Sequence, residues 1–341
     1  MLKKITLFFS ILTLLFTTSC NKIIEIADEL KDHHQVQVST YATGLVSPLG
    51  IEADAKGQLW VTESGTGTTN DGQLSLITRD GKVYPVVKGF PSSVSPEGAV
   101  FGLNHLILKD GTLYILHGVE GKLYKFNISS FHPGDAPIQA SQLAYEDIGT
   151  FVKNYVFQDD TNETDIFNLT VGPGGDLFIA DAAANAIIRR NSGNGKLSVF
   201  ATIPPVNNPA GNPAKVQAVP TGIVFDGHRF FVCTFTGYPY PAKNATIYQV
   251  DLNGNTSVYQ TGLSTLADIE LGIDQKPVVI EYGTWTGETF VQNSGTVVRS
   301  TRETNTQIVN GLNFPNAIKR SGLATYYVAL TFDGKIQKVV F

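Results

Sequence analysis

Oxygen-bearing side chains recur at the ends of short apolar segments that repeat along the chain. Segments such as LWVTE and LFIAD each finish on a polar residue, and a turn follows. In six successive copies this final position holds Glu63, His117, Asp181, Thr234, Glu281 and Leu330. Equivalent positions of a repeat protein lie on one face, and that face is often the binding face. The spacing therefore predicts a ring of polar side chains around a common site.

A second polar set stands at the start of the neighbouring apolar segments. Asn104, Asn168 and Asp268 begin their segments, and Thr221 and Asn316 stand one residue earlier in theirs. Carboxylate and amide oxygens are the ligands that hard cations prefer in proteins. We therefore predict a site for Ca²⁺ or Mg²⁺ formed by Glu97, Asn168, Asp268 and Asn316.

The same residues have a second interpretation that needs no ligand. Polar side chains at strand ends often cap turns and satisfy backbone groups that the strands leave unpaired. Both interpretations stay open at this point. If these residues bind a ligand, the ligand lies at the mouth of a central channel and contacts Glu63, His117, Asp181, Thr221, Tyr238 and Glu281.

Motifs for covalent catalysis are missing from the sequence. It contains no nucleophile elbow, P-loop, G-x-G-x-x-G, H-E-x-x-H or C-x-x-C, so no catalytic residue is assigned. The segment TGYPYP, Thr236 to Pro241, places two tyrosines between stiff prolines. We interpret it either as a packed loop or as an aromatic platform on which a sugar or aromatic ligand stacks.

The elements that must position these residues are strands. Each copy reads as four of them: GIEAD, LWVTE, QLSLIT and KVYPVVKGF in the first copy. The pattern returns about every fifty residues and occurs six times. Four strands per repeat predict an all-β fold, a six-bladed β-propeller with four-stranded blades.

An alanine-rich run tests this reading of the repeat. The stretch DAAANAIIRR, Asp181 to Arg190, has the local propensity of a helix. Its place in the repeat makes DAAAN a loop and AIIRRN a third strand. The irregular stretch 129–164 fits the repeat least well, and EDIGTFVKNYVF within it suggests a short helix.

The two ends of the repeat region complement each other. The last copy stops at Phe341 after three strands, and VQVSTYATGL, residues 36–45, resembles the missing fourth strand. We predict that the N-terminal strand completes the last blade, so that the ring has no open edge there.

Composition limits the partners. The 341 residues are 42% hydrophobic and 16% charged, with a net charge of −5. A chain with an acidic balance and no basic cluster is not expected to bind nucleic acid.

The first residues have the pattern of an export signal. Lys3 and Lys4 precede an apolar run, and small residues lead into Cys20 in the manner of a lipobox. We predict a lipoprotein signal peptide over 1–19, lipidation of Cys20, and a tether over 20–35. The propeller then spans 36–341 and is held at a membrane on the periplasmic or cell-surface side, with Cys233 as a buried thiol.

The segments DAAANAIIRR, VPTGI, TGYPYP and LADIELG resemble the ScyD/ScyE family of bacterial propellers over about residues 40–341. More distantly, the blades resemble NHL repeats and gluconolactonase-like propellers. The second resemblance implies a divalent cation held by Glu, Asn and Asp at the channel, similar in kind to Glu97, Asn168, Asp268 and Asn316. In place of the Asn-Pro-Tyr-Gly run usual in ScyD/ScyE, the chain has Asp165-Ile-Phe-Asn168.

Three functions follow from the sequence. The first is a lipid-anchored propeller that binds a small molecule or a partner at the channel mouth. The second is a metal-dependent lactonase-like hydrolase, in which the cation polarises a carbonyl and activates water. The third is an interaction scaffold without a small ligand.

Overall fold

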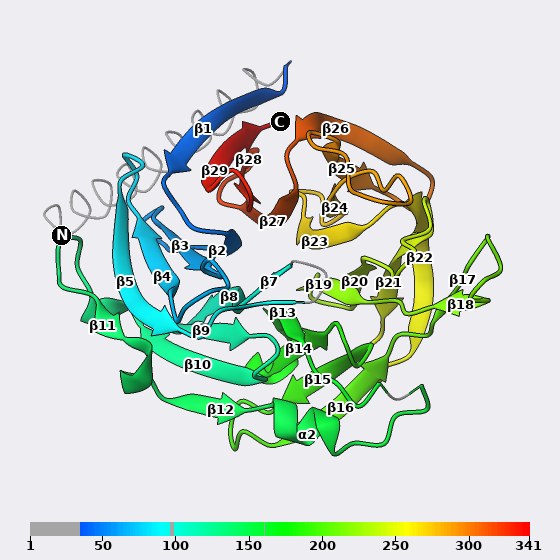
Figure 1. Cartoon of the computed structure of the whole chain (residues 1–341), viewed down its shortest axis with the longest axis horizontal. Coiled ribbons are helices and arrows are strands. Elements are labelled where there is room, and N and C mark those ends of the chain that lie inside the picture. The colour runs from blue at the N-terminus through cyan, green and yellow to red at the C-terminus, as the bar shows by residue number, and fades with distance from the viewer. Residues whose placement is uncertain (1–34, 96–98, 160) are drawn as a thin grey trace, which may run out of the picture.

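The computed structural model describes residues 35–95, 99–159 and 161–341. The predicted signal peptide, Cys20, nearly all of the tether and Glu97 lie outside these residues. The described chain forms six blades in a ring around a central channel, as predicted (Figure 1). Among the described residues no helix is long and apolar enough to span a bilayer.

Each blade is built on four antiparallel strands that run outward from the channel in chain order, except that β1 is the outermost strand of the last blade. The inner strands are β2 (Pro48–Ala53), β8 (Leu103–Lys109), β13 (Ile166–Val171), β19 (Pro220–Phe225), β23 (Leu266–Leu271) and β27 (Pro315–Arg320). The second strands are β3 (Leu59–Glu63), β9 (Thr112–His117), β14 (Leu177–Asp181), β20 (Phe230–Thr234), β24 (Pro277–Glu281) and β28 (Thr325–Leu330). All six second strands end on the residues that the sequence pattern gives.

The outer half of each blade repeats the same order. The third strands are β4 (Gly72–Ile77), β10 (Lys122–Asn127), β15 (Ala186–Arg190), β21 (Ala245–Val250), β25 (Gly295–Ser300) and β29 (Lys335–Val340). The outermost strands are β5 (Val83–Phe90), β12 (Tyr145–Asp147), β16 (Leu197–Thr202), β22 (Thr256–Leu263), β26 (Asn305–Leu312) and β1 (Gln37–Thr43).

Short insertions decorate this frame. The strand β11 (Ile138–Gln139) runs parallel to β5, and the helix α2 (Gly149–Lys153) lies in the irregular stretch where a short helix is predicted. Two hairpins extend the loops between blades. They are β6 (Ser93–Val94) with β7 (Val100–Phe101), and β17 (Val206–Asn207) with β18 (Lys215–Val216).

The alanine-rich run is a loop followed by a strand, as its place in the repeat predicts. The Asp181 carboxylate accepts the backbone N–H of Ala184 at 3.0 Å, and Asn185 adopts a left-handed φ of 52° that ends the turn. Ile187 and Ile188 are then fully buried in the cores on the two sides of the blade. This burial stabilises a strand by more than helix propensity favours a helix.

The first strand of the chain closes the ring. Residues Gln37 to Thr43 pair antiparallel with Val340 to Lys335 of β29, and the two strands lie side by side in Figure 1. Tyr41 packs on Tyr327 with ring centroids 4.6 Å apart and donates a hydrogen bond to the Thr78 carbonyl at 3.0 Å. The N-terminal strand therefore holds the last blade to the first.

Deleting residues 36–43 should weaken this closure. The last blade would lose the partner of β29 and expose an edge, so we expect the Tm to fall by about 5–10 °C, with aggregation. The control deletes residues 21–33, a change that should leave the Tm nearly unaltered. Equal melting temperatures for the two truncations, measured by circular dichroism, would contradict the strand exchange.

Candidate functional site

The loops on the two ends of the ring differ in their connections. We call the end with the loops between second and third strands, and with the loops between blades, the mouth face. The other end carries the turns that join first to second and third to fourth strands, and we call it the hairpin face. Five of the six predicted mouth residues stand at the mouth-face ends of strands, and Tyr238 lies in the mouth-face loop after β20.

A bulge near the start of each inner strand decides which side chains enter the channel. In β13, Ile166 pairs with Asp181, and after the bulge Asn168 pairs with Ala180. In β23, Leu266 pairs with Glu281, and Asp268 pairs with Ile280. Counting from the paired ends, the six residues just after the bulge are Gly50, His105, Asn168, Gly222, Asp268 and Ala317.

This register corrects one sequence assignment. His105, rather than Asn104, shares the position of Asn168 and Asp268, because the first pair of β8 joins Leu103 to His117. Asn104 instead occupies the bulge position, as Thr221 and Asn316 do. The sequence analysis missed His105, because the spacing that leads from Asp181 back to Asn168 leads from His117 back to Asn104.

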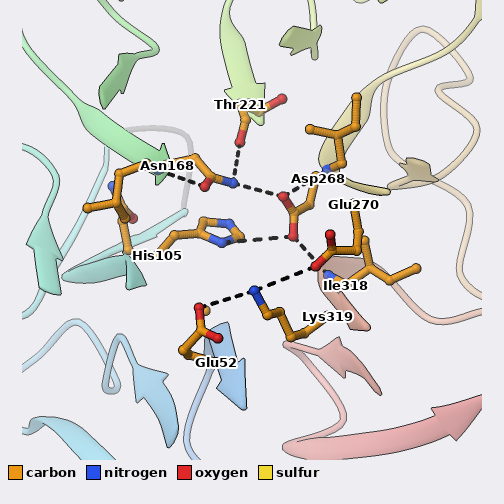
Figure 2. Close-up of polar contacts among 12 residues, drawn as sticks. Glu52, His105, Asn168, Thr221, Asp268, Glu270, Ile318 and Lys319 are labelled. Carbon is orange, nitrogen blue, oxygen red and sulfur yellow. Dashed lines mark hydrogen bonds and ion pairs between the residues drawn. The ribbon is translucent and has the colours of Figure 1, made fainter. Parts of the chain in front are cut away.

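Asp268 is the centre of the polar cluster in the channel (Figure 2). Its Oδ1 accepts hydrogen bonds from the Asn168 amide and the Ile269 N–H, both at 2.8 Å. Its Oδ2 accepts the N–H of Ile318 at 2.8 Å. Burial raises the pKa of Asp268 to about 7. The carboxyl thus ties the third, fifth and sixth blades together and remains close to its titration midpoint at neutral pH.

His105 brings an incompletely paired imidazole to the same cluster. Its Nδ1 lies 3.9 Å from Asp268 Oδ2, and its ring packs against Phe167 at 5.2 Å. The side chain is buried, and Nε2 has no hydrogen-bond partner within the described chain. Burial, with a smaller contribution from Lys319, lowers the pKa of His105 to about 3, so the ring is neutral.

A second charged layer lies two residues further along the inner strands. Lys319 Nζ is 3.1 Å from Glu52 Oε2 and 3.6 Å from Glu270 Oε2. A cavity of about 60 Å³ extends between this layer and the Asp268 layer. Its lining residues all come from the six inner strands, and the volume is enough for about two water molecules.

The predicted cation ligands do not gather in the described structure. Asn168 and Asp268 meet, but Asn316 turns away and donates to Thr331 Oγ1 at 2.8 Å. Both Asp268 oxygens already accept N–H groups, and Asn168 presents its NH₂ group rather than its oxygen to Asp268. No trio of His, Cys, Asp or Glu in the described ranges could hold a metal ion. The three members of the predicted set that the structure describes therefore do not form a Ca²⁺ or Mg²⁺ site by themselves.

Carboxylates at the mouth face hold the loops that lead into the inner strands. Glu63 accepts the Val46 N–H at 2.6 Å, and Asp181 accepts the Asp165 N–H at 2.9 Å. Glu281 accepts the Ser264 N–H at 2.8 Å. The same contact thus recurs in three blades. It matches the turn-capping interpretation of this column of residues.

Other members of the predicted ring also have partners within the protein. His117 Nε2 lies 2.9 Å from the Pro91 carbonyl oxygen, and the Thr221 hydroxyl donates to the Leu266 carbonyl at 2.5 Å. Tyr238 differs, since 69% of its surface is exposed. Of the six predicted mouth residues it is therefore the best placed to contact a ligand.

Tyr238 belongs to a connected group of aromatic rings on the mouth face, which we call the aromatic rim. Trp285 is 5.1 Å from Tyr240, 4.9 Å from Phe290 and 6.5 Å from Tyr238, measured between ring centroids. The loops that supply the rings follow β20, β24, β26 and β28. The members are Phe235, Tyr238, Tyr240, Tyr282, Trp285, Phe290, Phe314 and Phe332.

One further carboxyl at the mouth face was missed from the sequence. Asp165 Oδ1 accepts the Asn104 amide at 2.9 Å. Burial and the nearby Asp181 carboxylate raise the pKa of Asp165 to about 7. The residue stands in the DIFN segment, where the chain departs from the ScyD/ScyE pattern, and that departure was the only signal for it.

Comparison with known proteins shows the fold. No family model and no curated protein sequence matches the chain. A candidate gluconolactonase superposes with a TM-score of 0.55 at 12% identity, over 90% of this chain and 92% of that one. Virginiamycin B lyase from Staphylococcus aureus gives 0.53 at 17%, over 90% and 99% of the chains.

A third structure is the PQQ-bound aldose sugar dehydrogenase from Streptomyces coelicolor. It superposes with a TM-score of 0.57 at 14% identity, over 90% of this chain and 98% of that one. At these identities the likeness establishes the propeller architecture and carries no activity across. The shared fold hosts a lyase and a dehydrogenase, so function has to be argued from the side chains.

The buried Asp268 carboxyl should make stability depend on pH. Unfolded aspartate titrates near pH 4, whereas folded Asp268 holds its proton to about pH 7. The folded state therefore binds the extra proton, and its stability falls as the pH rises through this window.

Replacing Asp268 with Asn removes that titration. We expect the wild-type free energy of unfolding to fall by ~2–4 kcal/mol relative to Asp268→Asn between about pH 4 and pH 8. Denaturant unfolding across the pH range measures this difference. Both proteins retain His105, so its titration largely cancels. Parallel curves for the two proteins would show that Asp268 ionises normally.

Proposed function

We propose that this protein is an exported, lipid-anchored propeller that binds a small ring-bearing molecule at its mouth face. The observation that carries the proposal is the aromatic rim. It gathers eight rings from loops of three consecutive blades, while most other predicted mouth residues are engaged in capping contacts.

The loops that present the rings are held by backbone contacts. The N–H groups of Phe235, Thr236 and Gly237 donate to the carbonyls of residues 217–219 at 2.8–2.9 Å. In the next blade, the Val291 N–H donates to the Thr284 carbonyl at 2.9 Å. Because these loops are ordered before any ligand arrives, binding would cost little conformational entropy.

The exposed ends of the rim leave room for a flat ligand. Tyr238 and Phe332 are 69% and 66% exposed, and Val291, next to Phe290 in the chain, is 41% exposed. An aromatic contact adds about 0.5–1.5 kcal/mol beyond its buried area. The rim is therefore suited to a molecule with an apolar ring face, such as a sugar or an aromatic compound.

A buried donor inside the rim also supports a polar ligand or an ordered water. The Trp285 indole N–H is buried without a partner among the described residues. An unsatisfied buried donor costs about 1–3 kcal/mol, so an acceptor from a bound molecule would recover this cost. A sugar hydroxyl supplies both the ring face and the acceptor.

The hydrolase remains the second candidate. Two groups favour it: the neutral, partly unpaired His105 in the channel, and Asp165 with its raised pKa at the mouth face. Perturbed pKa values gather at catalytic sites, although structural networks produce them too. The likeness to ScyD/ScyE propellers stays a prediction, because no family model matches the chain.

Trp285 provides a direct probe of ligand binding. The chain has two tryptophans, and Trp60 is buried in the first blade with its indole bonded to Asp54 at 3.2 Å. In a Trp60→Phe background the fluorescence reports the rim alone. We expect saturable quenching or a spectral shift with at least one member of a panel of pyranosides, aryl glycosides and sugar lactones.

Removing the exposed ring should weaken that binding. Tyr238→Ala is expected to raise the Kd about 3–10-fold through the lost ring contact. The matched control is Tyr145→Ala, an exposed tyrosine on the outermost strand of another blade. Equal losses of affinity in both variants would contradict a binding site at the rim. Release of acid from a lactone would favour the hydrolase. No response to any compound would favour the scaffold.

The anchor has its own test. Wild-type protein should carry a fatty-acid label and sediment with membranes, whereas Cys20→Ser should be unlabelled and soluble. Cys233→Ala is the control, because that thiol is buried in the fold and should not affect labelling. A soluble wild-type protein whose mature N-terminus lies elsewhere would rule out the lipoprotein.

A further inference from the structure

A lysine stands between two glutamates at one end of the channel. Glu270, Lys319 and Glu52 occupy equivalent positions on β23, β27 and β2, which are neighbouring inner strands (Figure 2). The ammonium lies 3.1 Å from one carboxylate and 3.6 Å from the other. The order around the ring is thus acid, base, acid.

The lysine balances charges that would otherwise repel. The side chains of Glu52 and Glu270 are only 8% and 14% exposed, so water screens them weakly. Asp268 adds a third carboxyl one layer away, and it too attracts the ammonium. Although burial lowers it, the attraction of these acids holds the pKa of Lys319 above its ordinary value. A buried acidic group of this kind needs a cation.

We propose that Lys319 is the resident cation of the channel and occupies the place that a divalent ion would otherwise take. On this proposal the channel needs no metal ion. The sequence, in contrast, predicts a Ca²⁺ or Mg²⁺ ion bound by asparagine and aspartate side chains. The two glutamates are the oxygen donors a hard cation would use, and the lysine already pairs with both. Shortening Lys319 should therefore turn this position into a cation site.

The test compares melting temperatures of the purified mature protein after chelator treatment and titration with calcium or magnesium chloride. The wild-type Tm should not change with either ion. Lys319→Ala should melt at a lower temperature without metal, because the glutamates lose their counter-charge. Calcium at about a hundred times Kd should then raise the Tm of this variant by about 3–6 °C.

Two controls separate this effect from general charge removal. Lys335→Ala deletes a lysine of matching side-chain exposure, 27% against 26%, which pairs with Asp333 alone. It should gain nothing from calcium. Adding Glu270→Gln to Lys319→Ala removes one of the two oxygen donors and should abolish most of the calcium response.

The outcome is decisive even where the alanine variant fails to fold. Lys319→Gln then replaces it, since glutamine keeps polar contact with a carboxylate but carries no charge, and calcium should stabilise that variant as well. A saturable rise of the wild-type Tm with calcium or magnesium would overturn the proposal. So would the absence of any calcium response in both Lys319 variants. Neither result depends on ligand binding at the aromatic rim.

Discussion

Six strands must approach one axis closely, and this convergence governs what the channel can hold. A Cβ added to Gly50 would lie 2.7 Å from the His105 Cα, and one added to Gly222 would lie 2.7 Å from the Cys233 sulfur. Real Cβ atoms essentially never make such contacts, so glycine is required at both positions. Because these blades contribute no side chain after the bulge, the space beside them goes to His105, Asn168 and Asp268. The polar cluster is thus a consequence of how the ring closes.

The polar residues at the ends of the second strands could either hold the loops of the fold or bind a ligand. Glu63, Asp181 and Glu281 stand where a ligand ring is expected, but each accepts an N–H from the loop that enters its inner strand. A buried N–H without an acceptor would cost about 1–3 kcal/mol per blade, so the fold itself gives a reason for acids at this position. The repetition of polar residues along the sequence therefore reflects the repeated loop more than a repeated ligand.

The sequence could predict those parts of the structure that a visible feature of the repeat marks. The period of the apolar segments located all six second strands, because each end coincides with a turn. It placed β1 on the last blade, because an unfinished blade at one end matched a spare strand at the other. The bulge in each inner strand shifts the register by one residue, and no residue type marks it. His105 was missed for that reason, whereas Asn168 and Asp268 were found.

Contacts between segments far apart in the chain could not be predicted from local sequence patterns. Lys319 meets Glu52 across 267 residues of chain (319 − 52) and Glu270 across 49 (319 − 270), so only the closed ring brings them together. The aromatic rim is similar, because its rings come from four loops and only TGYPYP suggested it. The function of such loops depends on which of them lie together, and this is set by the blades that hold their ends.

Cavity size and exposed apolar surface favour the rim over the channel as the place for a ligand. The channel cavity of about 60 Å³ is far smaller than the ~300–1,000 Å³ of typical ligand pockets, and its charges are paired within the protein. The rim instead exposes Tyr238 and Phe332 to solvent, and it includes a tryptophan whose N–H lacks a partner in the described chain. Apolar surface gains free energy when a ring-bearing molecule covers it, and the unused donor gains it where that molecule supplies an acceptor. Binding free energy is therefore available at the mouth face, while the channel residues mainly hold the blades together.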